Sequence, residues 1–396
     1  MKRNALIITG SILVVILLAI WIYILFFNTT QPADKFTDLN IGNNPEQTSQ
    51  PETSASSTNP TLDVTSEKQL VQLTNKPTAG YKEILTGSSS PKVFYVESGT
   101  GHIYSIDLLT GVEKQLTITT ISFAKQAEIT ENGLFTMIQS GNNKKQTLIG
   151  TIINNNTELS TEIIDEEVVS FKATTNNTFL YAAKNSNQLV GKEYFPVTKT
   201  SKTLFTVPFL EATIDWGKVS ADTHYIYPKA SSKLEGYVYK VEKGTLIRTP
   251  ISGFGLSAVG NKQYILYSNQ NKESYKTTVY NSEQKLFTSS PVTIIPEKCT
   301  ESQTDTKILV CGSEFTNFND SIPDSWYQGV TSYADTLWQV DLDSLNIKSL
   351  ASVSDQSGRE IDTVNLSLNE AEDRVYFINK NDRTLWLYKR LTVNWE

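Results

Sequence analysis

One hairpin pattern occurs near both ends of the chain, as "VFYVESGTGHIYSIDLLTG" at 93–111 and as "VYFINKNDRTLWLYK" at 375–389. In each stretch an apolar or aromatic run leads into turn residues, and a second run with an aromatic residue follows. Two such runs around a short turn predict a β-hairpin. A chain that builds the same hairpin at both ends is expected to repeat one structural unit in between.

Further copies fill the interval. A third clear copy joins "KILVC" at 307–311 to "TLWQVDL" at 336–342, and four weaker copies complete the series. The first strands of the seven hairpins begin near Val93, Leu134, Thr178, Tyr225, Tyr264, Ile308 and Val375. Successive starts lie 39–47 residues apart except the last, where an insertion at 312–334 lengthens the spacing to 67. A period of about 40–45 residues with four short strands per unit predicts an all-β fold, a seven-bladed β-propeller.

The last unit has no fourth strand of its own. The residues "LVQLT" at 70–74 precede the first unit and resemble "EKQLT" at 113–117, the outer strand of that unit. We therefore expect 70–74 to be the outer strand of the last blade. This pairing would close the ring and cover an edge that is otherwise exposed.

The N-terminal region predicts a membrane anchor. Residues 5–27 are 23 consecutive uncharged residues, long enough to span a bilayer as a helix. Lys2 and Arg3 precede them, which places residues 1–4 in the cytoplasm and the rest of the chain outside. A cleaved signal peptide is the alternative, but "FFNTTQPADK" offers no small-x-small cleavage site.

A spacer follows the anchor. Residues 28–67 contain Ser or Thr at 13 positions and a single aromatic residue, Phe36. Such a composition buries too little apolar surface to offset the entropy lost on ordering. The sequence therefore predicts a flexible stalk at 28–67 and a propeller domain at 68–396.

The region from about 68 to 396 resembles seven-bladed propellers of the TolB or WD-repeat type. It is also similar to membrane-anchored propeller proteins of small-genome candidate-phylum bacteria, on the stretches "LVQLTN", "GHIYSIDLLTG" and "FINKNDRTLW". The resemblance implies the fold and the membrane placement. It carries no catalytic residue across to this chain.

Two cysteines and two histidines are the classical reactive candidates. Cys299 and Cys311 lie at the ends of successive strands, so an oxidising exterior predicts a disulfide between them, with two buried free thiols as the alternative. His102 and His224 fall in different units and different strand positions, which does not favour a shared metal or catalytic site. No cofactor or metal site is predicted.

The insertion carries the most informative side chains. Its aromatic residues are Phe315, Phe318, Trp326, Tyr327 and Tyr333. Exposed loop aromatics are typical of recognition surfaces, because Trp and Tyr dominate binding energy. The alternative is a self-packed loop that covers the mouth of the channel with its own small core.

We therefore expect a monomeric, membrane-tethered propeller outside the cell that binds a protein or a surface glycan without catalysis. The alternative is a glycan hydrolase or lyase with its site at the channel mouth. A converging cluster of charged residues in the channel would favour the enzyme. The net charge of −7 and the lack of a basic stripe speak against a nucleic-acid partner.

Overall fold

A computed structural model describes residues 68–85, 90–142, 144–153, 157–217, 223–271, 274–314 and 321–390. The predicted membrane anchor 5–27 and stalk 28–67 lie outside the described residues and stay predictions. Within the part of the chain that is described, no helix combines the length and apolar character needed to cross a membrane. The chain divides into two compact units, Met1–Ser57 and Thr58–Glu396, and every described residue belongs to the second.

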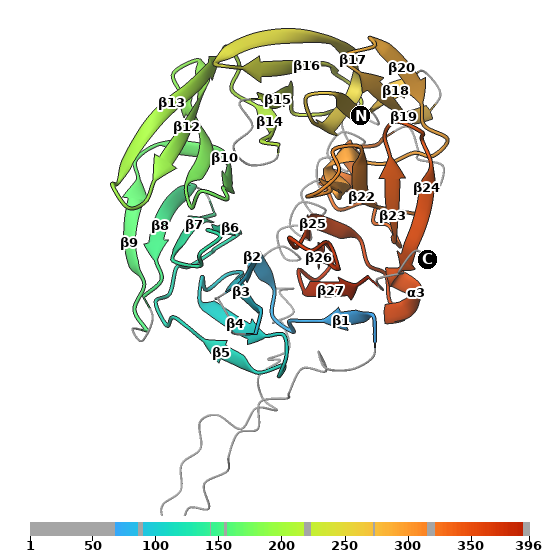
Figure 1. Cartoon of the computed structure of the whole chain (residues 1–396). Helices are drawn as coiled ribbons and strands as arrows, with labels where there is room; N and C mark the ends of the chain where they lie inside the picture. The colour runs from blue at the N-terminus through green and yellow to red at the C-terminus, as the bar shows by residue number, and fades with distance from the viewer. Residues whose placement is uncertain are drawn as a thin grey trace, which may run out of the picture. The chain divides into compact units, whose positions relative to one another are not determined.

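The second unit is built from antiparallel β-sheets that succeed one another around a ring (Figure 1). All seven predicted hairpins are formed, and each supplies two neighbouring strands in the interior of a sheet. The first three sheets have four strands each. They are β2 (Thr78–Ile84), β3 (Lys92–Glu97), β4 (Ile103–Asp107), β5 (Glu113–Gln115); β6 (Gln126–Ile129), β7 (Phe135–Ser140), β8 (Gln146–Thr151), β9 (Ser160–Ile164); and β10 (Glu167–Ala173), β11 (Phe179–Asn185), β12 (Gln188–Phe195), β13 (Thr200–Val207).

The next sheet has seven strands, because one long strand serves two hairpins. β17 (Thr245–Gly260) pairs with β16 along its first part and with β18 along its second. The sheet comprises β14 (Ala212–Asp215), β15 (Thr223–Pro228), β16 (Glu235–Glu242), β17, β18 (Tyr264–Asn271), β19 (Ser274–Asn281) and β20 (Leu286–Ser289). Hydrogen bonds thus join the fourth and fifth units, and the count of seven separate blades stays a prediction.

Two four-stranded sheets complete the ring. One contains β21 (Cys299–Glu301), β22 (Ile308–Ser313), β23 (Thr336–Asp341) and β24 (Ile347–Ser352); the other has the order β1 (Leu70–Gln72), β27 (Leu385–Lys389), β26 (Arg374–Asn379), β25 (Thr363–Leu368). Three short helices accompany them, η3 (Pro296–Lys298), α2 (Asp324–Tyr327) and α3 (Val353–Ser357).

The strand at the N-terminal end of the described residues completes the last sheet. β1 runs antiparallel to β27, with Val71 opposite Leu387. The backbone N–H of Leu73 extends the contact by donating to the carbonyl of Leu385 at 2.8 Å. Because β1 covers the free edge of β27, the two ends of the propeller domain are held by one ladder.

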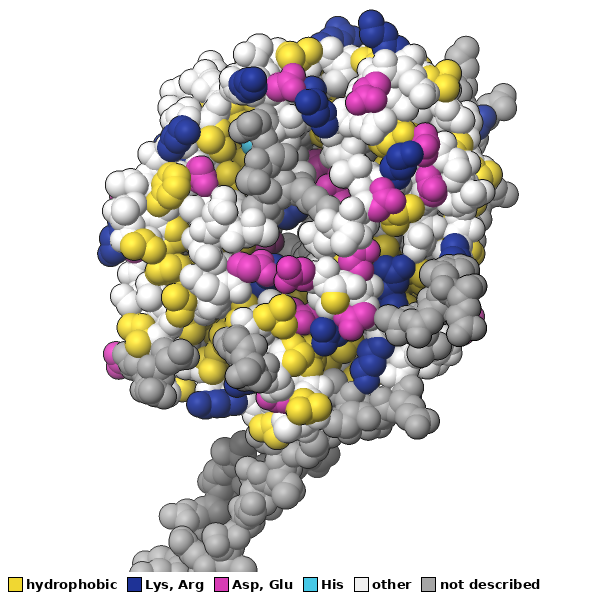
Figure 2. All heavy atoms as spheres, in the orientation of Figure 1, with side chains coloured by type: hydrophobic (Ala, Val, Ile, Leu, Met, Phe, Trp, Pro, Cys, Tyr) yellow, Lys and Arg dark blue, Asp and Glu magenta, His cyan; other side chains and the backbone are white. Residues whose placement is uncertain are grey.

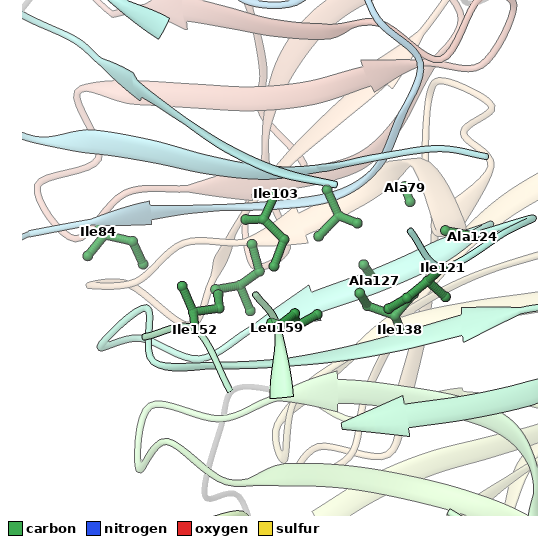
Figure 3. Close-up of a cluster of buried hydrophobic side chains, with 11 residues drawn as sticks. Ala79, Ile84, Ile103, Ile121, Ala124, Ala127, Ile138, Ile152 and Leu159 are labelled. Atoms are coloured by element: carbon green, nitrogen blue, oxygen red, sulfur yellow. The ribbon is translucent and has the colours of Figure 1, made fainter. Parts of the chain in front are cut away.

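The core lies between successive sheets. Figure 3 shows one such cluster, to which Ile103 of β4 and Ile138 of β7 both contribute between the first two sheets. A corresponding cluster combines Val71 and Tyr95 with Leu387, and so packs the last sheet against the first. Apolar packing of neighbouring sheets therefore closes the ring in addition to the β1–β27 ladder.

One face of the ring carries the insertion. In an antiparallel sheet, the turn between the second and third strands lies at the same end as the start of the first strand. The β22–β23 connection, which contains 321–335, therefore shares a face with the β26–β27 turn, and the Ser332 hydroxyl donates to Asn381 of that turn at 2.9 Å. We call this side the insertion face.

Candidate functional site

The insertion packs into the domain rather than projecting from it. Trp326 and Tyr333 are 4% and 5% exposed and form a small apolar cluster with Tyr275, Ile295 and Ile322. Tyr327 is half-buried, and Phe315 and Phe318 lie outside the described residues. The burial of Trp326 and Tyr333 agrees with the self-packed alternative. A role of the five aromatic residues in binding stays a prediction.

Polar contacts hold the insertion against other parts of the ring. The Asp324 carboxylate accepts a hydrogen bond from the backbone N–H of Ser232, in the β15–β16 turn, at 2.6 Å. The Tyr327 hydroxyl donates to Glu297, at η3. α2 is therefore bound to residues that are distant in the sequence, which explains why a four-residue helix has a defined place.

A buried cluster of charges lies beneath the insertion. Lys298, Asp335 and Asp362 each stand one residue before a strand, namely β21, β23 and β25, and their side chains are at most 2% exposed. The Lys298 ammonium lies 2.8 Å from Asp335 Oδ1, 2.7 Å from Asp335 Oδ2 and 2.6 Å from Asp362 Oδ1. Burial of a lone charge is costly, so the mutual pairing of these groups is what makes their burial possible.

Neighbouring donors satisfy the remaining carboxylate oxygens. Thr363 donates both its backbone N–H and its hydroxyl to Asp335 Oδ2 at 2.7 Å. The indole N–H of Trp326 donates to Asp362 Oδ2 at 2.8 Å. A glycine at 312 makes room for this arrangement, since a Cβ atom there would stand 1.8 Å from the Thr363 hydroxyl.

Burial also changes the acidity of this cluster. It raises the pKa of Asp335 to about 6, because loss of hydration outweighs the attraction of Lys298. At the edge of the cluster, burial lowers the pKa of Lys380, whose ammonium is 3.9 Å from Asp362 Oδ2. Both shifts favour the neutral form of the group.

A polar cleft of about 270 Å³ opens beside the insertion on the same face. Its lining residues lie in the β7–β8 turn, in or next to β10, β11, β14 and β15, and in η3 and α2. The lining residues are Lys145, Glu167, Val169, Lys184, Glu211, Ala212, Thr213, Lys229, Glu297 and Tyr327. Figure 2 shows acidic and basic side chains close together around the hollow at the middle of the face in view.

The charges that line the cleft fall into two groups. Lys184 is held by Glu167 and Glu211 at 2.9 Å each, and its hydrogen bond lowers the pKa of Glu211. Lys145 and Lys229 are exposed, and within the described residues their ammonium groups have no hydrogen bond or ion pair. These two ammonium groups are therefore available to a ligand.

Glu297 is the least usual carboxyl group in the cleft. Burial raises its pKa, while the hydrogen bond from Tyr327 and the charge of Lys229 act in the opposite direction. A carboxyl group with a raised pKa can serve as a proton donor as well as an acceptor.

The other candidates from the sequence lie elsewhere. Cys299 and Cys311 stand directly opposite each other on β21 and β22 and form the predicted disulfide, which is confirmed. His224 is buried against Trp216, and His102 lies beside Thr120. Among the described residues, no group of three or more His, Cys, Asp or Glu side chains is placed to hold a metal ion.

Comparison with solved structures identifies the fold. An oligogalacturonate lyase from Vibrio parahaemolyticus matches with a TM-score of 0.51 at 11% identity, over 81% of this chain and 93% of that one. The β-propeller domain of Cps50 (Swd1) from Myceliophteria thermophila matches with a TM-score of 0.50 at 8% identity, over 81% and 99% of the two chains. The chain folds as a β-propeller.

Kuenenia stuttgartiensis hydrazine synthase is also similar, with a TM-score of 0.51 at 9% identity over 80% of this chain and 97% of that one. Identities this low show a shared fold and nothing about function. No protein-family model matches the chain, and no curated protein matches it.

Proposed function

We propose that the protein is a membrane-tethered, seven-bladed propeller that works outside the cytoplasm as a monomeric, non-enzymatic binding module for a protein or a surface glycan. The cleft on the insertion face carries the proposal. It is concave and polar, and it presents the ammonium groups of Lys145 and Lys229 without partners among the described residues. A ligand with carboxylate or other acidic groups would match them.

The disulfide supports the location. Cys299 and Cys311 are joined within a β-sheet, and structural disulfides belong to oxidising compartments. The uncharged segment 5–27 with Lys2 and Arg3 before it supplies the tether in this proposal.

The buried charge cluster does not favour hydrolysis or lyase chemistry in the channel. A converging cluster of charges is present, but Lys298, Asp335 and Asp362 are at most 2% exposed and bond to one another. A glycan cannot reach groups that the insertion covers. The enzyme hypothesis therefore has to rest on the open cleft.

One observation keeps that hypothesis as a second candidate. Glu297 borders the cleft with a raised pKa, and Tyr327 and Lys229 lie next to it. This arrangement could supply an acid and a cation to a glycan hydrolase or lyase at the channel mouth. The similarity to an oligogalacturonate lyase is a similarity of fold and does not add to this argument.

The test is capture by the full-length, membrane-embedded protein. Cell-surface proteins would be cross-linked to it, and glycan isolated from the same surface would be offered separately. The double variant Lys145→Ala with Lys229→Ala should lose capture, while Lys307→Ala should keep it. Lys307 is a matched control because it lies on the opposite face and is already paired with Asp343. Equal capture by both variants would refute the cleft as the binding site.

The same glycan separates the two candidate functions. Wild-type protein should leave its chain length unchanged if binding is the function. If the wild-type protein shortens the glycan and Glu297→Gln does not, the protein is instead an enzyme.

A further inference from the structure

Lys298 is placed as a nucleophile against two carboxyl groups. Its nitrogen is within 2.8 Å of both oxygens of Asp335, and Asp362 contacts it from a second side at 2.6 Å. An amine held this close to both oxygens of a carboxyl group, with water excluded, has the proximity that accelerates bond formation between bound groups. The binding proposal above has no use for this cluster.

The surroundings exclude water from both reactants and favour the neutral form of Asp335. The rings of Tyr333 and Trp326 lie 4.9 Å and 5.9 Å from the Lys298 nitrogen and help to exclude water. The pKa of Asp335, raised to about 6, leaves part of the population protonated at neutral pH. A neutral amine and a neutral carboxylic acid are the forms that can condense.

The two carboxyl groups have different partners, which assigns them different roles. Asp335 Oδ2 receives two hydrogen bonds from Thr363, and such donors stabilise the oxyanion of a tetrahedral intermediate. Asp362 is held by the Trp326 indole, with its other oxygen directed at the amine. Asp335 is therefore the electrophile and Asp362 the proton carrier.

We propose that Lys298 and Asp335 become joined by an amide bond that the folded domain forms without a cofactor. The Lys298 nitrogen bonds to the Asp335 side-chain carbon, and Asp362 takes the proton that the amine loses. Asp362 then returns this proton to Asp335 Oδ1, whose bond to carbon breaks. One water molecule leaves, and no oxidation or reduction takes place.

An exposed pair in the same sheet provides an internal comparison. Lys307 and Asp343 are slightly closer, at 2.6 Å, than the proposed reactants, at 2.7 and 2.8 Å, but both are nearly half exposed. The hydrogen bond between them raises the pKa of Lys307 and lowers that of Asp343, so both stay charged. Among the described residues, no second carboxylate is bonded to Lys307 that could carry its proton. We expect no amide bond there, so burial and the second carboxyl group, and not proximity alone, decide the reaction.

The test is mass spectrometry on the full-length protein purified from membranes, after reduction of the disulfide. The intact mass should be lower than the sequence mass by one water molecule. Trypsin should fail to cleave after Lys298, so that residues 286–307 remain joined to 308–348 as a branched peptide. An intact mass equal to the sequence mass, with normal cleavage after Lys298, would overturn the proposal.

Asp362 is tested by the shape-conserving variant Asp362→Asn. It should abolish the branched peptide while the protein stays folded by circular dichroism, and Lys307→Arg should leave the branched peptide unchanged. A cross-linked Asp362→Asn protein would overturn the role of Asp362. A branch to residues 360–374, the tryptic peptide that contains Asp362, would overturn the choice of Asp335 as the partner.

Discussion

Glu297 and Lys298 are neighbours in the chain, yet they have opposite surroundings. Glu297 borders the open cleft with Tyr327 as its donor, whereas Lys298 is buried between two carboxylates. η3 ends at this point, and its short turn directs consecutive side chains to different sides. One local structure thus supplies a residue to each of the two sites on the insertion face.

The raised pKa of Glu297 predicts a pH dependence of stability. The folded state retains a proton between the ordinary value of 4.5 and the raised pKa, while the unfolded state has released it. The free energy of unfolding therefore falls as pH rises through this window. Glu297→Gln should flatten this fall, which urea unfolding of the full-length protein at a series of pH values would measure.

Glu211→Gln is the control for this prediction. The hydrogen bond from Lys184 lowers the pKa of Glu211, so its contribution to stability is lost as pH falls, the reverse of Glu297. Identical pH profiles for the wild type and Glu297→Gln would contradict the assignment.

Local signals made some residues predictable from the sequence. Asp107 and Asp341 occupy equivalent places before turns, and each accepts hydrogen bonds from backbone N–H groups two and three residues later. The pairing of Cys299 with Cys311 was also predictable, because the two cysteines stand at the ends of successive strands. Lys298, by contrast, meets Asp335 and Asp362 across 37 and 64 residues, and nothing local distinguishes these two from the other carboxylates in the chain.

At the scale of the element, the hairpins were predictable because each is contiguous in sequence. The long β17 was not predicted, since Pro250 and Gly253 in "TLIRTPISGFGLSAVG" read as a break between two strands. The chain instead continues through them with shifts in register against β16 and β18. A stretch with the composition of a turn can therefore continue as a strand where hydrogen bonds join two repeat units in one sheet.

β1, the strand that closes the ring, gives the prediction at the scale of the element. A chain that starts at residue 61 should melt like one that retains 28–60, because that stretch is predicted to be stalk. A chain that starts at residue 75 loses β1 and the buried side chains of Val71 and Leu73. Burial of two such side chains is worth about 3–6 kcal/mol, so this chain should melt at a clearly lower temperature. Equal melting temperatures for the two truncations would disprove closure by β1.

At the scale of the whole domain, the sites share one face because of how the strands alternate. Turns between second and third strands, and starts of first strands, meet at the same end of every sheet. This places Lys229, Glu297 and the cluster around Lys298 together, although they come from different sheets. Sequence could predict that such a face exists, but not which of its side chains converge, because that depends on the curvature of the ring.

The same alternation predicts how the domain is presented. The carbonyl of Gln69 accepts a hydrogen bond from the N–H of Lys389, at the end of β27 that is remote from the β26–β27 turn. The chain therefore enters the propeller on the side opposite the insertion face. If residues 5–27 anchor it, the cleft should point away from the membrane, toward partners outside.

Energy transfer to a lipid-bound acceptor in proteoliposomes would measure this orientation. A donor dye would be attached through Leu109→Cys, in the β4–β5 turn of the opposite face, or through Val330→Cys, in the insertion; these positions are 68% and 77% exposed. The native cysteines are paired, so each variant has a single reactive thiol. Transfer should be stronger from position 109 because it lies nearer the bilayer. Stronger transfer from position 330 would mean that the cleft faces the membrane, which contradicts the proposed orientation. Equal transfer would mean that the stalk lets the domain tumble freely.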